Sequence, residues 1–376
     1  MAPKKKPIAK KAESDEEPPR KKSAPLICCP EVYLTRPPQP KVKKPGQLND
    51  DQLLQFFEEG FVLVKDFLKP EELQPVRDAI ERLVDDLAER LFKAGKIKDK
   101  HKDASLFKRL TLLEKEYPGT AVILHKTGKL PQGFRDLWSN ERLLNVMEQL
   151  VGPEVAGNPV WNLRTKTPYN EQTEVPWHQD NAYFDEEALG TLIPTAWIPL
   201  LDATVQNGCM QMVRGGHRKG ILARHVCCTG GTWYVEMAKE GMDQTLGCDL
   251  TKDVVTCEMT YGSVLLFNNL TPHRSLPNIS DDVRWSLDLR WQDPGKPAGL
   301  WGLKGSLPMR SANNPDLTID WEIFEAVNRN KQQQKSVDNV TGAEDEFDAT
   351  IQGPWMTRWE IVNHNKHTRS MAIPGK

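Results

Sequence analysis

Two histidines and one carboxylate in this sequence are spaced so that they could bind a single metal ion. His178 and Asp180 stand two residues apart, and on a β-strand both side chains would point to the same face. Taken alone, this pair is more simply explained as ordinary surface or core residues. His273, which follows a strongly apolar segment, supplies a second imidazole from a distant part of the chain. Two histidines and a carboxylate leave adjacent positions open on Fe(II), whereas a structural zinc site uses four protein ligands, mostly cysteine. The set therefore predicts a catalytic iron site.

A strand with two different faces follows the second histidine. In VRWSLDLRW, residues 283–291, polar and apolar side chains alternate. Arg284 lies eleven residues after His273, and a turn between them would bring its guanidinium back beside the metal. A guanidinium can hold a carboxylate with two hydrogen bonds, as a small dicarboxylate co-substrate requires. The polar face could instead meet solvent, but we expect it to line a barrel interior. The polar residues are Arg284, Ser286, Asp288 and Arg290, and the apolar ones are Val283, Trp285, Leu287, Leu289 and Trp291.

Residues near the predicted metal strand are candidates for the pocket. Asn162, Arg164 and Lys166 alternate on one strand, and one of them could donate to the co-substrate; a solvated edge is an equally simple interpretation. Four more candidates follow from adjacency alone and are expected more often to be structural: Trp161, Gln179, Asn181 and Tyr183.

The hydrophobic pattern predicts which elements position these residues. Helices are expected first, over 49–60, 70–92 and 135–151, with a strand at Phe61–Val64 after the first helix. Short strands separated by Gly, Pro and Asn then dominate, which is typical of a sandwich or barrel. The expected strands are Val160–Thr167, Thr195–Leu201, Gly208–Val213, Ser263–Asn268 and Val283–Trp291. The fold class predicted is α+β with a mainly β core, a jelly roll with N-terminal helices packed on it.

Charge and composition divide the chain into a tail and a body. Residues 1–46 hold twelve Lys or Arg, five acids and ten prolines, so we predict a disordered tail that solubilises the protein, serves as a nuclear address or weakly contacts a polyanion. Residues 47–376 are expected to form one domain, and their acidic balance argues against a nucleic-acid-binding domain. Within it we expect a helical part over 47–155, a β core over 156–295 and a C-terminal extension over 296–376, in which the polar segment 328–347 forms a loop or lid.

Composition also excludes some classes of protein. The longest uncharged, largely apolar run, Leu189–Leu201, is far short of the roughly 20 residues that cross a bilayer. The first residues lack the apolar region of a secretory signal, and the last do not match a peroxisomal signal. Seven cysteines without a CxxC pair indicate reduced thiols rather than a disulfide framework or zinc site. We therefore expect an intracellular protein, cytoplasmic or nuclear.

Several motifs together resemble one known family. His178, Asp180, His273 and Arg284 match the pattern of the phytanoyl-CoA dioxygenase-like group of Fe(II)/2-oxoglutarate-dependent oxygenases. The surrounding segments VPWHQDNAYF, TAWIPLLDATVQNGCMQMVRGGHRKG and EEGFVLVKDFL are similar to those of the family, although Gly216 replaces the usual Ser. The resemblance covers roughly residues 48–295.

The resemblance implies a double-stranded β-helix and a set of residue roles. Iron would be held by His178, Asp180 and His273, and 2-oxoglutarate by Arg284 and Ser275. Trp197 would lie against the co-substrate, and Lys166 is a further candidate contact.

The resemblance also implies a reaction and its partners. Because Asp180 is present, hydroxylation rather than halogenation is expected, with O2 consumed, succinate and CO2 released and ascorbate as an optional reductant. The expected substrate is a small organic metabolite. Alternatives are a non-catalytic jelly roll that binds a ligand or partner protein, and an oxygenase acting on a macromolecule.

Overall fold

The computed structural model describes residues 25–337, 345–369 and 371. The helices are α1 (Pro30–Leu34), α2 (Asp50–Glu59), α3 (Pro70–Lys93), α4 (Leu106–Glu116), α5 (Thr120–His125), α6 (Gln132–Trp138), α7 (Glu141–Val151), α8 (Trp321–Ala326), α9 (Arg329–Val337) and α10 (Trp355–Arg358). The strands are β1 (Leu26–Ile27), β2 (Phe61–Val64), β3 (Val155–Gly157), β4 (Asn162–Lys166), β5 (Thr195–Pro199), β6 (Met210–Val213), β7 (Ile221–Leu222), β8 (His225–Cys227), β9 (Val235–Met237), β10 (Val254–Cys257), β11 (Val264–Phe267), β12 (His273–Ser275), β13 (Arg284–Gln292), β14 (Leu307–Arg310) and β15 (Glu360–Ile361).

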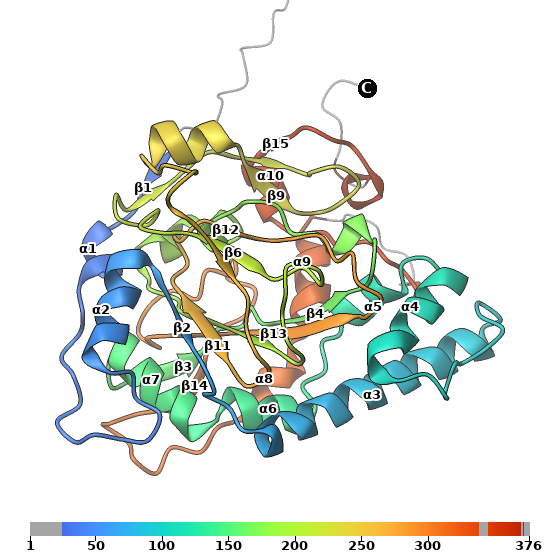
Figure 1. Ribbon diagram of the computed structural model, residues 1–376, viewed down its shortest axis with the longest axis horizontal. Helices are drawn as coiled ribbons and strands as arrows, with labels where there is room; N and C mark the ends of the chain where they lie inside the picture. The colour runs from blue at the N-terminus through green and yellow to red at the C-terminus, as the bar shows by residue number, and fades with distance from the viewer. Residues whose placement is uncertain (1–24, 338–344, 370, 372–376) are drawn as a thin grey trace, which may run out of the picture.

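Two antiparallel sheets form the β core. The large sheet has the order β14-β3-β13-β5-β11-β2, with β4 also paired to β13, and the small sheet has the order β10-β6-β12. In Figure 1, helices α3, α6 and α7 cover the large sheet on the side away from β6 and β12. The predicted class, a mainly antiparallel β core with helices packed on it, is confirmed. None of the helices in the described residues is both long and apolar enough to cross a membrane.

Strand β13 connects the core to the site. All nine of its residues are buried, so neither face of the strand meets solvent. Its apolar face joins the main hydrophobic core, where Trp285 donates from Nε1 to the Leu106 carbonyl at 3.1 Å. Its polar face supplies side chains to cavities inside the barrel, which is the arrangement that the alternation predicted. Burial on both faces makes β13 a fixed base for the residues that it carries.

The helices expected over 49–60 and 70–92 are present as α2 and α3, whereas α4 and α5 were not expected and the third expected helix is broken. Helix α2 begins with a capping box, in which the Asn49 and Gln52 side chains bond each other's backbone N–H. The single helix expected over 135–151 is divided into α6 and α7. The reason is local: the Asn140 side chain accepts from the N–H groups of Arg142 and Leu143 and so caps a new helix.

The segment 25–46 differs from the predicted disorder. Leu26 and Ile27 pair with β7, and the Tyr33 ring is completely buried. The Tyr33 hydroxyl donates to the Leu189 carbonyl at 2.8 Å and accepts from Asn181 Nδ2 at 3.1 Å. The average composition of residues 1–46 did not indicate this ordered segment, because a few well-placed apolar residues are enough to order a polar segment. Residues 1–24 of the predicted tail lie outside the described part of the chain.

The hydrogen bonds of the Tyr33 hydroxyl give a first prediction. Tyr33→Phe removes the hydroxyl and leaves the Asn181 amide and the Leu189 carbonyl without that partner, so we expect a loss of about 1–3 kcal/mol in the free energy of unfolding. Urea denaturation measures this loss. Tyr169→Phe is a matched control, because that tyrosine is 73% exposed and should change the stability by less than about 0.5 kcal/mol. If the two variants are equally stable, the Tyr33 hydroxyl does not stabilise the protein as predicted.

Two further segments differ from the sequence predictions. The polar segment 328–347, expected to be a loop or lid, forms helix α9 over part of its length, and residues 338–344 lie outside the described part. Only Gln333 of α9 is buried, so no apolar stripe was present to predict the helix. Cys227 and Cys228 are joined by a disulfide, whereas reduced thiols were expected. A disulfide between adjacent residues does not connect distant parts of the chain, so it is not part of the disulfide framework that cysteine spacing can indicate.

Candidate functional site

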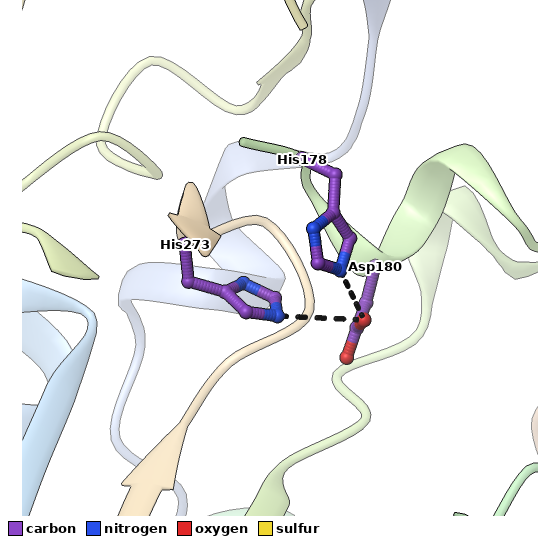
Figure 2. Close-up of side chains that lie close together, drawn as sticks. All are labelled: His178, Asp180 and His273. Atoms are coloured by element: carbon purple, nitrogen blue, oxygen red, sulfur yellow. Dashed lines mark ion pairs between the residues drawn. The ribbon is translucent and has the colours of Figure 1, made fainter. Parts of the chain in front are cut away.

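The two histidines and the aspartate come together inside the barrel. His178 forms a β-bridge with His273 of β12, in which each N–H bonds the other residue's carbonyl, at 3.0 and 2.9 Å. Asp180 begins a short 3-10 turn rather than continuing the expected strand. It still points to the same side as His178, because Gln179 between them is extended. Figure 2 shows the three side chains converging on one point.

The distances between the three donor atoms fit a shared metal ion. His178 Nε2 and His273 Nε2 lie 3.5 and 3.7 Å from Asp180 Oδ1, and all three residues are buried. Atoms bound about 2.1 Å from one metal lie roughly 3–4 Å apart, so this spacing matches a common ligand sphere.

The second nitrogen of each imidazole fixes its tautomer. His178 Nδ1 lies 2.9 Å from the Pro176 carbonyl, and His273 Nδ1 lies 2.9 Å from the Thr271 carbonyl. A carbonyl only accepts, so each Nδ1 carries a proton and each Nε2 is the atom that faces Asp180. Burial, together with His178, lowers the pKa of His273 to about 3, so this ring is neutral. Two imidazole Nε2 atoms and a carboxylate oxygen therefore face one another, an arrangement that suits a bound cation.

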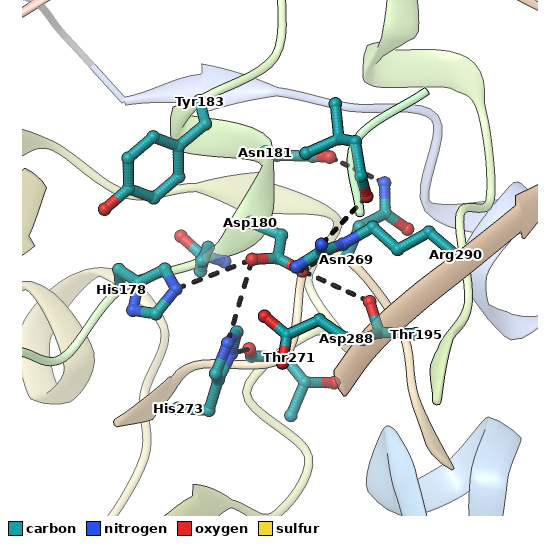
Figure 3. Close-up of polar contacts among 12 residues, drawn as sticks. His178, Asp180, Asn181, Tyr183, Thr195, Asn269, Thr271, His273, Asp288 and Arg290 are labelled. Atoms are coloured by element: carbon teal, nitrogen blue, oxygen red, sulfur yellow. Dashed lines mark hydrogen bonds and ion pairs between the residues drawn. The ribbon is translucent and has the colours of Figure 1, made fainter. Parts of the chain in front are cut away.

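The other carboxylate oxygen of Asp180 is held by Arg290. The Nη2 and Nε atoms of Arg290 donate to Asp180 Oδ2 at 2.8 and 3.1 Å, and Thr195 Oγ1 donates to it at 3.3 Å (Figure 3). Burial alone would raise the pKa of Asp180, but the Arg290 guanidinium holds it well below its usual value. With Oδ2 occupied, Oδ1 is left to face the histidines. The sequence placed Arg290 on the polar face of its strand but gave it no role.

Arg284 and Lys166 are two buried basic groups with no carboxylate oxygen within 4.0 Å among the residues that the structure describes. They occupy opposite positions on the neighbouring strands β13 and β4, and each is at most 2% exposed. Arg284 donates to Ser286 Oγ at 2.7 Å and its buried Nε has no partner, while Lys166 donates to the Leu276 carbonyl at 2.8 Å. Burial lowers the pKa of Arg284 to about 10 and the pKa of Lys166 well below its ordinary value. Both line a cavity of about 550 Å³, here called the Arg284 cavity, which also reaches both histidines.

Ser275 and Trp197 complete the same cavity. Ser275 accepts from the Val175 N–H at 3.3 Å, and the Trp197 ring lies 5.0 Å from the guanidinium carbon of Arg284. The structure thus brings together all seven residues that the sequence singled out, and each lines the cavity or belongs to the triad: Lys166, His178, Asp180, Trp197, His273, Ser275 and Arg284.

The weaker candidates divide into wall residues and structural residues. Tyr183 packs edge-on against His178 at 5.6 Å between ring centroids and lines a second cavity. Gln179 is structural, since its amide bonds the Ile221 and Leu270 carbonyls and the Ala223 N–H. Asn181 is bound within a buried network with Tyr33 and Asn269, and Trp161 lines neither of the two cavities described.

The second cavity, of about 720 Å³, adjoins the first, shares His178 and Arg290 with it, also reaches Asp180 and is here called the Arg329 cavity. Asn162 and Arg164 line it, and Arg164 forms a 2.6 Å ion pair with Asp288. Much of its wall comes from the C-terminal extension: Leu300, Arg329, Asn330, Gln333, Ile351 and Trp355. A loop or lid was expected over 328–347, but the individual wall residues could not be predicted, because they are scattered over polar loops and a polar helix.

The fold and the three converging donor atoms define a class, that of jelly-roll proteins with a two-histidine, one-carboxylate metal site. Comparison with protein families gives a match to the phytanoyl-CoA dioxygenase (PhyH) model over residues 56–286. The chain belongs to this family of Fe(II)/2-oxoglutarate-dependent dioxygenases, as its motifs predicted.

Individual relatives agree with this assignment. The 1-deoxypentalenic acid 11-beta-hydroxylase of Streptomyces arenae is 30% identical over 174 residues, which cover 44% of this chain and 59% of that protein. The ectoine dioxygenase of Nocardia farcinica is 24% identical over 259 residues, covering 65% and 78%. The crystal structure of EctD from S. alaskensis with 2-oxoglutarate and 5-hydroxyectoine covers 80% of this chain and 92% of its own, with a TM-score of 0.51 and 16% identity, which shows a shared fold.

Proposed function

We propose that this protein hydroxylates a small organic molecule with 2-oxoglutarate and O2, releasing succinate and CO2. In this proposal His178, Asp180 and His273 hold Fe(II). When bound, the iron supplies the redox chemistry with O2, and the protein supplies orientation and a dry pocket. The observation that carries the proposal is that the Nε2 atoms of two imidazoles and one carboxylate oxygen lie within 4.8 Å of one another, while both Nδ1 atoms are bonded to backbone carbonyls.

Arg284 is proposed to bind the distal carboxylate of 2-oxoglutarate. Its support is the orphaned Nε of a buried guanidinium, together with Lys166 beside it, in a cavity that extends to the histidines. A buried cation is costly unless it is paired, and a carboxylate would supply the missing partner. Ser275 would add a hydroxyl contact, and Trp197 would limit the space beside the guanidinium.

The test is the formation of succinate from 2-oxoglutarate by the purified protein with Fe(II), ascorbate and O2. We expect succinate from the native protein, because such turnover does not require the primary substrate, and none above background from His178→Ala. If no succinate forms, calorimetry with Fe(II) and 2-oxoglutarate under nitrogen decides whether the enzyme is waiting for its substrate. Absence of both metal binding and co-substrate binding would overturn the proposal.

Arg290 gives a second prediction, since it acts on the metal only through Asp180. Arg290→Met removes both hydrogen bonds to Asp180 Oδ2 and frees the carboxylate to rotate, so we expect the affinity for Co(II) or Fe(II) to fall roughly 10- to 100-fold. Calorimetry measures the affinity, and the visible spectrum of bound Co(II) reports the altered ligand geometry.

Two variants control this measurement. Arg290→Lys keeps a cation beside Asp180 and should recover part of the affinity, while Arg82→Met changes an exposed arginine and should have no effect. An unchanged affinity and spectrum in Arg290→Met would exclude the positioning role.

A further inference from the structure

Helix α9 brings an arginine to the metal side of the Arg329 cavity. The helix lies beside β4, where Arg329 Nη1 donates to the Trp161 carbonyl at 2.6 Å and Nη2 donates to Asn162 Oδ1 at 3.2 Å (Figure 1). Three longer contacts, all 3.4 Å, go to the Pro159 carbonyl and to Asn330 Oδ1. Every one of these acceptors is neutral, so the hydrogen bonds hold the guanidinium in place without balancing its charge.

The other three cations of the same cavity each have a carboxylate. Lys126 is paired with Asp348 at 3.1 Å, Arg164 with Asp288 at 2.6 Å, and Arg290 with Asp180 at 2.8 Å. Arg329 has no carboxylate oxygen within 4.0 Å among the residues that the structure describes. The cavity therefore carries one unbalanced positive charge, which belongs to the Arg329 guanidinium.

That charge lies close to the triad. Arg290 Nη1 donates to the Val160 carbonyl at 3.0 Å, and Arg329 donates to the carbonyl of the next residue, Trp161. The two guanidiniums thus occupy neighbouring positions along one stretch of backbone, and Arg290 in turn contacts Asp180. Burial, with the like charges of Arg290 and Arg164, lowers the pKa of Arg329 to about 9, which leaves it charged at neutral pH. An anion beside it would relieve this repulsion.

The co-substrate does not account for this charge. Arg284 and Lys166, to which 2-oxoglutarate is assigned, line the Arg284 cavity and not the Arg329 cavity, and Arg329 lines only the latter of the two. Apolar side chains, among them Phe184, Leu300 and Trp355, form much of the remaining wall. The site therefore combines one cationic group with an apolar surface.

We propose that the substrate is an organic acid whose carboxylate pairs with Arg329 and whose apolar part packs against Phe184, Leu300 and Trp355. This inference rests on the proposed function and names its substrate class. A single unbalanced charge matches one carboxylate, whereas an acyl-CoA would bring several phosphate charges for which the cavity has no further unpaired cation among its described residues.

Binding of matched acids and amides tests the proposal. The protein is loaded with Fe(II) and 2-oxoglutarate under nitrogen and titrated by calorimetry with octanoate, cyclohexanecarboxylate and 3-phenylpropanoate, each beside its primary amide. We expect at least one acid to bind, and to bind at least about 10-fold more tightly than its amide, because only the acid forms a charge-assisted hydrogen bond. Failure of all three acids to bind, or equal binding of acids and amides, would overturn it.

Variants on the same helix localise the effect. Arg329→Gln should abolish the preference for acids, Arg329→Lys should retain it because the positive charge remains, and Lys335→Gln, an exposed residue of α9, should behave as the native protein. Survival of the preference in Arg329→Gln would overturn the proposal. If this variant does not fold, loss of the preference in Arg329→Lys overturns it and retention supports it.

The succinate assay without any added acid keeps the two proposals separate. It tests the oxygenase function alone, whereas the calorimetric preference for acids is measured without turnover. A protein that forms succinate but shows no preference for acids loses only the substrate assignment.

Discussion

Asp180→Ala is expected to weaken Fe(II) binding more than about 100-fold and to lower the free energy of unfolding of the metal-free protein by about 3–5 kcal/mol. The first effect follows from the loss of a proposed ligand, which exceeds the 10- to 100-fold effect of losing a group that only orients one. The second follows from Arg290, which is 3% exposed and would keep a buried charge without its partner. Calorimetry measures the affinity, and urea denaturation in the presence of a chelator measures the stability.

His178→Ala separates the two effects. It also removes a proposed ligand, but it leaves the ion pair of Asp180 with Arg290 in place, so the metal-free protein should lose less stability than with Asp180→Ala. Equal stability losses in the two metal-free variants would show that the ion pair does not contribute as described. Full metal affinity in either variant would remove that residue from the proposed ligand set.

Arg284→Met is expected to lower the affinity for 2-oxoglutarate at least about 30-fold without lowering the stability of the ligand-free protein. Removing one partner of a buried charge pair costs about 2–5 kcal/mol of binding, which corresponds to this factor or more. In the ligand-free protein, however, Arg284 is a buried charge without a carboxylate partner in the described part of the chain, and its replacement by an apolar side chain removes a cost. Calorimetry on the metal-loaded protein under nitrogen gives the affinity, and denaturation gives the stability.

Two comparisons make this result specific. Arg82→Met replaces an exposed arginine and should change neither quantity. The opposite stability effects of Asp180→Ala and Arg284→Met test a single principle, that one buried charge is paired within the protein and the other awaits a ligand. A large loss of stability in Arg284→Met would instead indicate that the arginine is structural.

The parts of the site that could be predicted from the sequence are those that depend on short-range patterns. The triad depends on a His-x-Asp pair and one further histidine, and the faces of β13 follow from a period of two residues, so both could be predicted. The 3-10 turn at Asp180 was missed because the pair alone does not distinguish a strand from a single extended residue.

The features that could not be predicted depend on tertiary contacts, which leave no simple pattern in the sequence. Tyr33 orders a polar segment through one buried ring, and α9 forms without an apolar stripe. Arg329 could not be singled out, since its significance lies in the absence of a nearby carboxylate, which is a property of the folded molecule. For the same reason the sequence suggested Asn162, Arg164 and Tyr183, which line the Arg329 cavity, but not the part of its wall that the C-terminal extension supplies.

The burial of β13 on both faces has a consequence for motion. A strand bonded to neighbours along its length and buried throughout exchanges its amide hydrogens only when the whole domain opens, so Arg284 and Arg290 lie on a segment among the last to open. Helix α9 has one buried residue and is expected to open at a much lower free energy. We therefore expect slow amide exchange along β13 and much faster exchange in α9, which forms part of the wall of the Arg329 cavity, so that this wall could open while β13 stays closed.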